Sequence, residues 1–223
     1  MRDAFHTELD RISAELSAMA RLVELAVTRS TQALLTANLG LAEQVIGTDA
    51  AIDDLQRVVE DQAFEQLALQ QPVATDLRAL VATLRAVAEL ERMGDLAEHV
   101  AEVARMRYPD VAVPPQLHDD FRRMGDLAAQ MVQMAGVNFV ERDLDAARAV
   151  MDLDDEMDRL RAGLFRVMVA DTWTHGVEAA VDVALLGRYY ERIADHCVST
   201  ARRVVYLVTG EYPVLEPPAV HTI

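Results

Sequence analysis

The residues of this chain that are best suited to chemistry are four pairs of acids with one common spacing. Each pair has the form acid-x-x-x-acid, which places both carboxylates on one face of a helix, one turn apart. Two like charges in this position repel each other by about 0.2–0.5 kcal/mol, so four such pairs demand an explanation. The pairs are Asp49 and Asp53, Glu91 and Asp95, Asp154 and Asp158, and Glu191 and Asp195.

These acid pairs recur at matching places in the two halves of the chain. The segments Glu91-Arg-Met-Gly-Asp95 and Glu191-Arg-Ile-Ala-Asp195 begin 100 residues apart, at positions 91 and 191. The earlier segments Asp49-Ala-Ala-Ile-Asp53 and Asp154-Asp-Glu-Met-Asp158 also correspond, with an offset of 105 residues between positions 49 and 154. A repeat of this length indicates a duplicated structural unit, with each motif on the equivalent helix of its half.

The residue pattern leaves three explanations of these acids open, which are solvated helix faces, ion pairs with arginine and metal binding. Glu91 continues an apolar stripe that contains Leu84 and Val87, and partly buried carboxylates need either arginine or metal. Arg92 and Arg192 directly follow the motif glutamates, which favours ion pairs. Oxygen ligands favour hard ions such as magnesium or manganese, and carboxylate clusters in helix bundles also hold iron.

The two halves differ in the residues that come after the acids. His99 lies one turn after Asp95, so the first half adds an imidazole to its carboxylates. The equivalent residue of the second half is Ser199, and Arg202 can reach back to pair with Asp195. We therefore expect the first half to bind a divalent or trivalent cation more tightly than the second.

The elements that must carry these acids are long helices. The seven prolines leave long proline-free stretches with apolar residues at helical spacing, and a proline inside a helix costs about 3 kcal/mol. The fold class predicted is all-α, with two tandem repeats of an antiparallel three-helix bundle. The helices are expected near 5–37, 41–70, 74–107, 116–140, 144–171 and 175–209. The predicted parts are a first repeat over 1–108, a linker over 109–115, a second repeat over 116–210 and a tail over 211–223.

Composition and missing motifs exclude several classes of protein. The net charge of −16 argues against nucleic acid and against direct attraction to an anionic membrane. The single cysteine, Cys197, excludes an internal disulfide, and the N-terminus has no apolar signal segment, so we expect a cytoplasmic protein. The sequence contains no phosphate-binding glycine loop, no Gly-x-Ser-x-Gly and no Glu-x-x-His, which argues against a di-iron oxidase and against an enzyme in general.

Several short segments, in a fixed order, carry a resemblance to a known family. Each segment is weak alone, but their order, spacing and duplication are specific. Through them the chain resembles the PhoU family of phosphate-signalling regulators over about residues 2–210. The segments are Arg2-x-x-Phe5-x-x-x-Leu9, Asp49-x-x-Ile52-Asp53, Gln71-Pro-Val-Ala-Thr-Asp-Leu-Arg78, Leu90-Glu-Arg-Met-Gly-Asp95, Asp154-Asp-Glu-Met-Asp158 and Tyr190-Glu-Arg-Ile-Ala-Asp-His196.

The resemblance implies a regulator that works by protein contacts. Members of this family are six-helix bundles of two repeats, and they restrain the phosphate-starvation response and phosphate uptake. They relay the state of the phosphate ABC transporter, through its ATPase subunit, to a phosphate-sensing histidine kinase. They act at the inner membrane face through partner proteins, often as homodimers. The alternatives kept open are a metal-storing bundle and a metal-dependent oxidase or hydrolase.

The resemblance also implies metal ligands at the acid motifs, because some members bind multinuclear metal clusters there. The metals considered are iron, zinc, manganese and magnesium. The chain departs from the family pattern where an asparagine usually follows the motif aspartate, since His99 and Ser199 stand there. A glutamate often follows three residues later, and in this chain Glu102 keeps it while Arg202 does not. The expected ligands are Asp49, Asp53, Glu91, Asp95, His99, Asp154, Asp158, Glu191 and Asp195.

Overall fold

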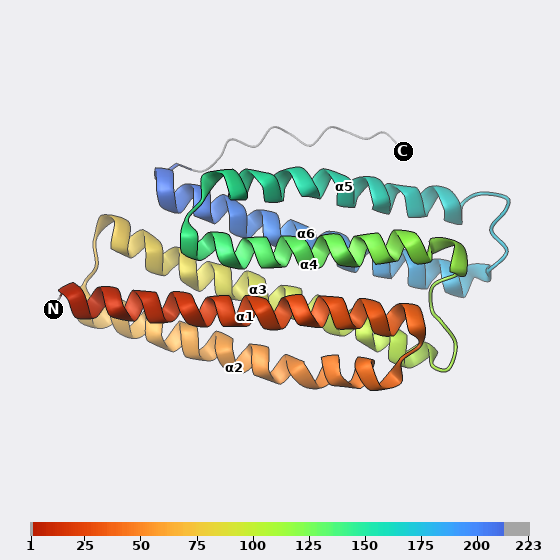
Figure 1. The fold of residues 1–223 in the computed structure, drawn as a ribbon, viewed down its shortest axis with the longest axis horizontal. Coiled ribbons are helices and arrows are strands. Elements are labelled where there is room, and N and C mark those ends of the chain that lie inside the picture. Colours follow the sequence, from red (N-terminus) through yellow and green to blue (C-terminus); the bar gives the residue numbers. More distant parts are fainter. Residues whose placement is uncertain (1, 212–223) are drawn as a thin grey trace.

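The fold is a bundle of six long helices. The structure is a computed structural model that describes residues 2–211, apart from the side chains of residues 2–4 and 6. The predicted tail, beyond Glu211, lies outside the described residues. Residues 2–211 contain no strand, which confirms the predicted all-α bundle of six helices. The helices are α1 (Arg2–Thr36), α2 (Leu39–Gln70), α3 (Ala74–Arg107), α4 (His118–Glu141), α5 (Leu144–Met168) and α6 (Gly176–Thr209), with a 3-10 turn η1 (Pro115–Leu117) before α4 (Figure 1).

Several helix ends differ from the predicted boundaries by one to three residues, and two of these differences have a clear structural cause. The fifth helix ends at Met168 and not near residue 171. The chain then turns around Trp173, whose Nε1 donates a hydrogen bond to the carbonyl of Gly176 at 2.9 Å. The fourth helix begins at His118, because the residues after Pro114 first form the 3-10 turn η1. Both differences lie at connections, where side-chain contacts rather than periodicity decide where a helix ends.

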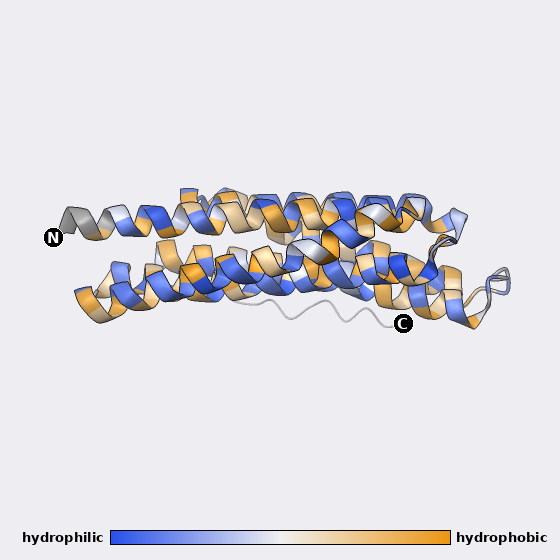
Figure 2. Ribbon diagram, turned by 90° about the horizontal axis from the view of Figure 1, so that it is seen from below, coloured by the Kyte–Doolittle hydropathy of each residue, from blue (hydrophilic) through white to orange (hydrophobic). Residues whose placement is uncertain are grey.

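The six helices form two groups of three that pack against each other through four helices. Within the first group α1, α2 and α3 contact one another, and α4, α5 and α6 do the same in the second. Between the groups α1 packs on α4 and α3 packs on α6, so α2 and α5 lie outermost (Figure 1). Polar and apolar residues alternate along every helix in Figure 2, as expected where each helix turns one face inward.

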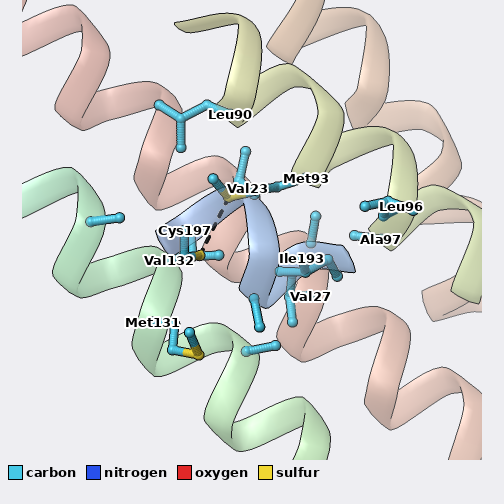
Figure 3. Packing of buried hydrophobic residues seen from close by; sticks show 14 of the residues in the cluster. Val23, Val27, Leu90, Met93, Leu96, Ala97, Met131, Val132, Ile193 and Cys197 are labelled. Carbon is cyan, nitrogen blue, oxygen red and sulfur yellow. Dashed lines mark hydrogen bonds between the residues drawn. The ribbon is translucent and has the colours of Figure 1, made fainter. Parts of the chain in front are cut away.

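A single apolar core crosses the contact between the two groups. Figure 3 shows Val23 of α1, Met93 of α3, Val132 of α4 and Cys197 of α6 close together in this core. All four side chains are buried, and the thiol of Cys197 lies 3.6 Å from the sulfur of Met93. Burial raises the pKa of the Cys197 thiol. The thiol is therefore a packing group, and we assign it no reactivity.

The helices α1 and α4 approach closely because glycines lie at their contact. A Cβ atom at Gly136 would lie 2.4 Å from the Cβ of Ala20, and one at Gly125 would lie 2.4 Å from the side chain of Thr31. The hydroxyl of Thr31 is also 2.7 Å from the hydroxyl of Tyr190, which is fully buried. The two groups of helices are thus joined by close backbone approach as well as by apolar packing.

No described helix is long and apolar enough to cross a membrane.

Candidate functional site

The four acids of the first half come together where α2 faces α3. Asp49 and Asp53 project from α2, and Glu91 and Asp95 project from α3. Burial raises the pKa of Asp49, and the charges of Asp53 and Asp95 raise it further. Burial also raises the pKa of Glu91, followed by the charge of Asp95. These four acids, which we name the first carboxylate cluster, therefore repel one another across two helices, as their spacing predicted.

A fifth acid joins this cluster although the acid-x-x-x-acid pattern does not contain it. Burial raises the pKa of Glu98, and the charge that adds most to this effect is that of Asp49. Glu98 follows Glu91 by seven residues, which is two helical turns, so it lies on the same face of α3. Extending the motif by a full heptad would have found this residue in the sequence.

His99 interacts both with the first cluster and with a residue of the second repeat. Its positive form would lower the pKa of Asp49, so the ring is within electrostatic reach of the acids. The ring is exposed, however, and stacks on Tyr189 of α6, with ring centroids 5.4 Å apart and an interplanar angle of 28°. His99 therefore connects the first cluster to the second repeat.

One arginine pairs with the acids of the first cluster. Arg92 Nη1 lies 2.8 Å from a carboxylate oxygen of Asp95, and its Nε lies 3.5 Å from Glu91. The Arg92 side chain is 61% exposed, and exposed pairs of this kind contribute little stability. Ion pairing thus occurs at this cluster, but one guanidinium does not neutralise four or five carboxylates.

The second carboxylate cluster lies where α5 faces α6, and it contains Asp154, Asp158, Glu191 and Asp195. Burial raises the pKa of Asp154 to about 7, with further contributions from Asp158 and Asp195. One carboxylate oxygen of Asp154, Oδ1, is buried and has no hydrogen-bond partner. Asp154 is therefore the acid whose negative charge is least compensated in either cluster.

Two arginines, Arg188 and Arg161, pair with the second cluster. Glu191, which is 8% exposed, forms a close ion pair with Arg188 and lies 3.5 Å from Arg161 Nη1. Within residues 2–211, Arg202 forms no ion pair with Asp195, so that prediction was wrong. Arg202 follows Asp195 by two turns, whereas Arg188 precedes Glu191 by less than one turn and Arg161 projects from the facing helix. The ion pairs of Glu191 are therefore formed by the guanidinium groups that lie nearer to it.

The two clusters fit a metal in residue type but not in their present side-chain orientations. Carboxylate oxygens suit hard cations, and each cluster draws them from two facing helices. Among the described residues, however, no three histidine, cysteine, aspartate or glutamate side chains converge closely enough to hold a metal ion. The arrangement attracts cations electrostatically, and closer coordination requires the side chains to rotate.

The repulsion at Asp154 predicts a dependence of stability on pH. Between the usual aspartate pKa of 3.8 and about 7, folded Asp154 holds a proton that the unfolded chain has lost. Stability contributed by this group therefore falls as the pH rises from about 4 to 7 and is then constant. Asp154→Asn removes the charge, so we expect it to raise the free energy of unfolding by about 2 kcal/mol at pH 8, after allowance for solvent screening.

This gain is measured by urea unfolding in the presence of a chelator, at pH 4 and at pH 8. At pH 4 the protonated aspartate resembles asparagine, so the gain should vanish. Asp152→Asn, at an exposed position two residues earlier on α5, is the matched control and should change little at either pH. An equal gain at both pH values would show that charge repulsion is not its cause.

Ion pairs across the α3–α6 contact join the two repeats. Glu89 Oε2 lies 2.6 Å from His196 Nδ1, and Glu89 Oε1 lies 2.5 Å from Arg203 Nη2. Farther along the contact, Arg107 Nε lies 2.6 Å from Asp182, which is 5% exposed. No sequence pattern indicated these pairs, because their partners are 75 to 114 residues apart.

Comparisons with known proteins agree with this fold and with the two repeats. The family model for the PhoU domain matches residues 16–104 and 121–204. Phosphate-specific transport system accessory protein PhoU homolog 2 of Mycobacterium tuberculosis is 46% identical over 213 residues, which cover 96% of this chain and all of the relative. The corresponding Aquifex aeolicus homolog is 34% identical over 206 residues, which cover 92% of each protein.

Solved structures give the same result. The crystal structure of PhoU from Pseudomonas aeruginosa matches with a TM-score of 0.84 and 32% identity, covering 93% of this chain and all of that one. The phosphate transport system regulatory protein PhoU from Streptococcus pneumoniae matches with a TM-score of 0.84 and 25% identity, covering 95% of this chain and all of that one. Since the family model matches both repeats and relatives align over nearly the whole chain, the chain belongs to the PhoU family.

Proposed function

We propose that this protein is a cytoplasmic, non-catalytic adaptor that restrains the phosphate-starvation response and phosphate uptake. It contacts the ATPase subunit of a phosphate ABC transporter and relays the transporter's state to a phosphate-sensing histidine kinase. The observation that carries this proposal is the 46% identity, over the full length of the relative, to a phosphate-specific transport system accessory protein. The protein acts as a homodimer, reaches the membrane only through its partners and binds no nucleic acid.

The surface of the molecule supports a role in protein contacts. The α2–α3 connection and the start of α3 expose Val73 and Leu77, and the start of α6 exposes Val177 and Val181. The α2–α3 connection and the start of α6 lie at opposite ends of the bundle (Figure 1). Exposed apolar side chains gathered at an element's end are typical of protein-binding surfaces. Two separate apolar ends suit an adaptor that touches two partners.

The test of this function combines a deletion strain with a pull-down. Without the gene, phosphate-starvation promoters should stay active in phosphate-rich medium, and a plasmid copy should silence them. The purified protein should retain the transporter ATPase, and Leu77→Asp or Val177→Asp should weaken that contact or the contact with the kinase. Normal repression in a strain that lacks every homologous copy would refute the regulatory role.

We also propose that the carboxylate clusters bind a divalent or trivalent cation, such as iron, zinc, manganese or magnesium. Burial, and then the neighbouring carboxylates of the same cluster, raise the pKa values of Asp49, Glu91 and Asp154. This supports the proposal, because a cation would relieve the repulsion within each cluster. The first cluster should bind the cation more tightly, because Glu191 of the second cluster already forms ion pairs with two arginines.

Calorimetric titration of the metal-free protein measures this asymmetry. We expect Asp95→Ala to reduce cation affinity at least tenfold and Asp195→Ala to reduce it less, because Asp95 belongs to the tighter site. Asp152→Ala, which removes an exposed acid outside both clusters, controls for the loss of one negative charge. Equal losses for the two cluster variants would refute the asymmetry, and the absence of any binding would leave the arginines as the only cations.

A further inference from the structure

A small groove lies between the end of α4 and the start of α5. The helix α5 packs mainly on α6 and meets α4 over a shorter stretch, which leaves a cavity of about 210 Å³ between them. Its lining is largely apolar and it opens to solvent, where Val137 is 49% exposed. The lining residues are Gln133, Met134, Val137, Asn138, Glu141 and Ala146.

The floor of this groove contains an amide without hydrogen bonds. Asn138 is 1% exposed, and neither its Oδ1 nor its Nδ2 has a partner. A buried polar atom without a partner costs about 1–3 kcal/mol, and nearly all such atoms in folded proteins are paired. A ligand that satisfies this amide must offer both a donor and an acceptor, as one peptide group does with its N–H and C=O.

The chain itself supplies a peptide of suitable length at the correct end of the bundle. Twelve residues, 212–223, follow the last described residue, and their sequence is Tyr-Pro-Val-Leu-Glu-Pro-Pro-Ala-Val-His-Thr-Ile. The helices α5 and α6 are antiparallel neighbours, so the end of α6 lies beside the start of α5 and the end of α4 (Figure 1). Twelve extended residues span roughly 40 Å, several times the width of about 10 Å of one helix.

The composition of this segment also matches the groove. Three prolines favour an extended backbone, which loses little conformational entropy on binding. Val214, Leu215 and Val220 provide apolar side chains for the apolar walls. The residues that pair with Asn138 must be other than proline, since proline has no N–H to donate.

We propose that residues 212–223 bind in the α4–α5 groove of their own chain as an extended peptide. The Nδ2 group of Asn138 donates a hydrogen bond to a backbone carbonyl of the segment, and Oδ1 accepts one from a backbone N–H. The amide atoms lie beneath the groove wall, so binding requires the rim side chains to move. Met134 is the most adaptable of them, because its side chain is unbranched and has three rotatable bonds.

The test uses a fluorescein-labelled peptide of residues 212–223 and fluorescence anisotropy. A chain that ends at Glu211 retains all six helices, because every residue of the described core lies between Phe5 and Leu207. We expect the peptide to bind this shortened chain saturably. It should bind the full chain at least tenfold more weakly, because the attached segment competes at a high effective concentration.

Two variants of the shortened chain locate the binding site. Asn138→Leu replaces the amide by an apolar group of similar size and should lower peptide affinity at least tenfold. Ala146→Glu narrows the groove, yet it preserves α5, because a glutamate three residues after the N-cap Asp143 is favourable at a helix start. Ala162→Glu, at an exposed position far along α5, is the matched control and should leave affinity unchanged.

Three results would overturn the proposal. The first is no saturable binding of the peptide to the shortened chain while circular dichroism shows intact helices. The second is equal peptide affinity for the shortened chain and both groove variants. The third is a dimer of the full chain that dissociates when residues 212–223 are removed, because the segment would then occupy the groove of a second copy.

Discussion

Gly136→Leu is expected to lower the free energy of unfolding by about 3 kcal/mol, because the contact between α1 and α4 has no room for a side chain. A Cβ atom at Gly136 would lie 2.4 Å from the Cβ of Ala20, and Ala20 is only 3% exposed. Relief requires α1 and α4 to separate, and this contact holds the two repeats together. Equilibrium unfolding in guanidinium chloride measures the loss.

A matched glycine shows whether space or helix propensity causes the effect. Gly163 of α5 has no atom within 4 Å of the position where its Cβ would lie. Gly163→Ala should therefore stabilise the protein by about 1 kcal/mol, since alanine favours a helix more than glycine does. If Gly136→Leu unfolds at the same denaturant concentration as the wild type, the close approach of α1 and α4 is not needed for stability.

Glu89→Leu is expected to cost about 3 kcal/mol, because it leaves two half-buried partners without their acceptor. The Glu89 carboxylate bridges His196 and Arg203 of α6, and all three side chains are no more than 20% exposed. Glu89→Gln keeps the shape and one acceptor oxygen but loses the charge, so its cost should be about half as large. Thermal and urea unfolding of both variants measures these differences.

The same carboxylate also predicts how stability changes in acid. Burial by itself would raise the pKa of Glu89, but the hydrogen bonds from His196 and Arg203 outweigh burial and hold the pKa below its usual value of 4.5. Its contribution is therefore fully present above pH 4.5 and is lost as the pH falls through the lower pKa of the folded protein. The difference between the wild type and Glu89→Gln should shrink in that range.

Glu65→Gln, at an exposed glutamate of α2, serves as the control for this acid effect. It should leave the stability nearly unchanged, because exposed charges contribute little to stability. A cost for Glu89→Gln that stays constant down to pH 3 would show that the charge of Glu89 is not what joins α3 to α6.

The helices and the pairing of the acids could be predicted from the amino-acid sequence. Prolines and the 3.6-residue period placed all six helices, because local chain geometry decides where a helix can continue. The acids Asp49 and Asp53 lie opposite Glu91 and Asp95, as expected where short connections make neighbouring helices antiparallel. The repeated acid motifs extended the same reasoning to the second half.

The partners that these residues find depend on the packing of the whole molecule. Arg161 of the facing helix pairs with Glu191. His99 stacks on Tyr189 of the other repeat. The unpaired amide of Asn138 could not be foreseen either, because it depends on how closely α5 approaches α4. Helical periodicity sets the face on which a side chain lies. The partner of that side chain depends on how helices far apart in the chain approach and cross each other. The packing of the whole core sets this arrangement.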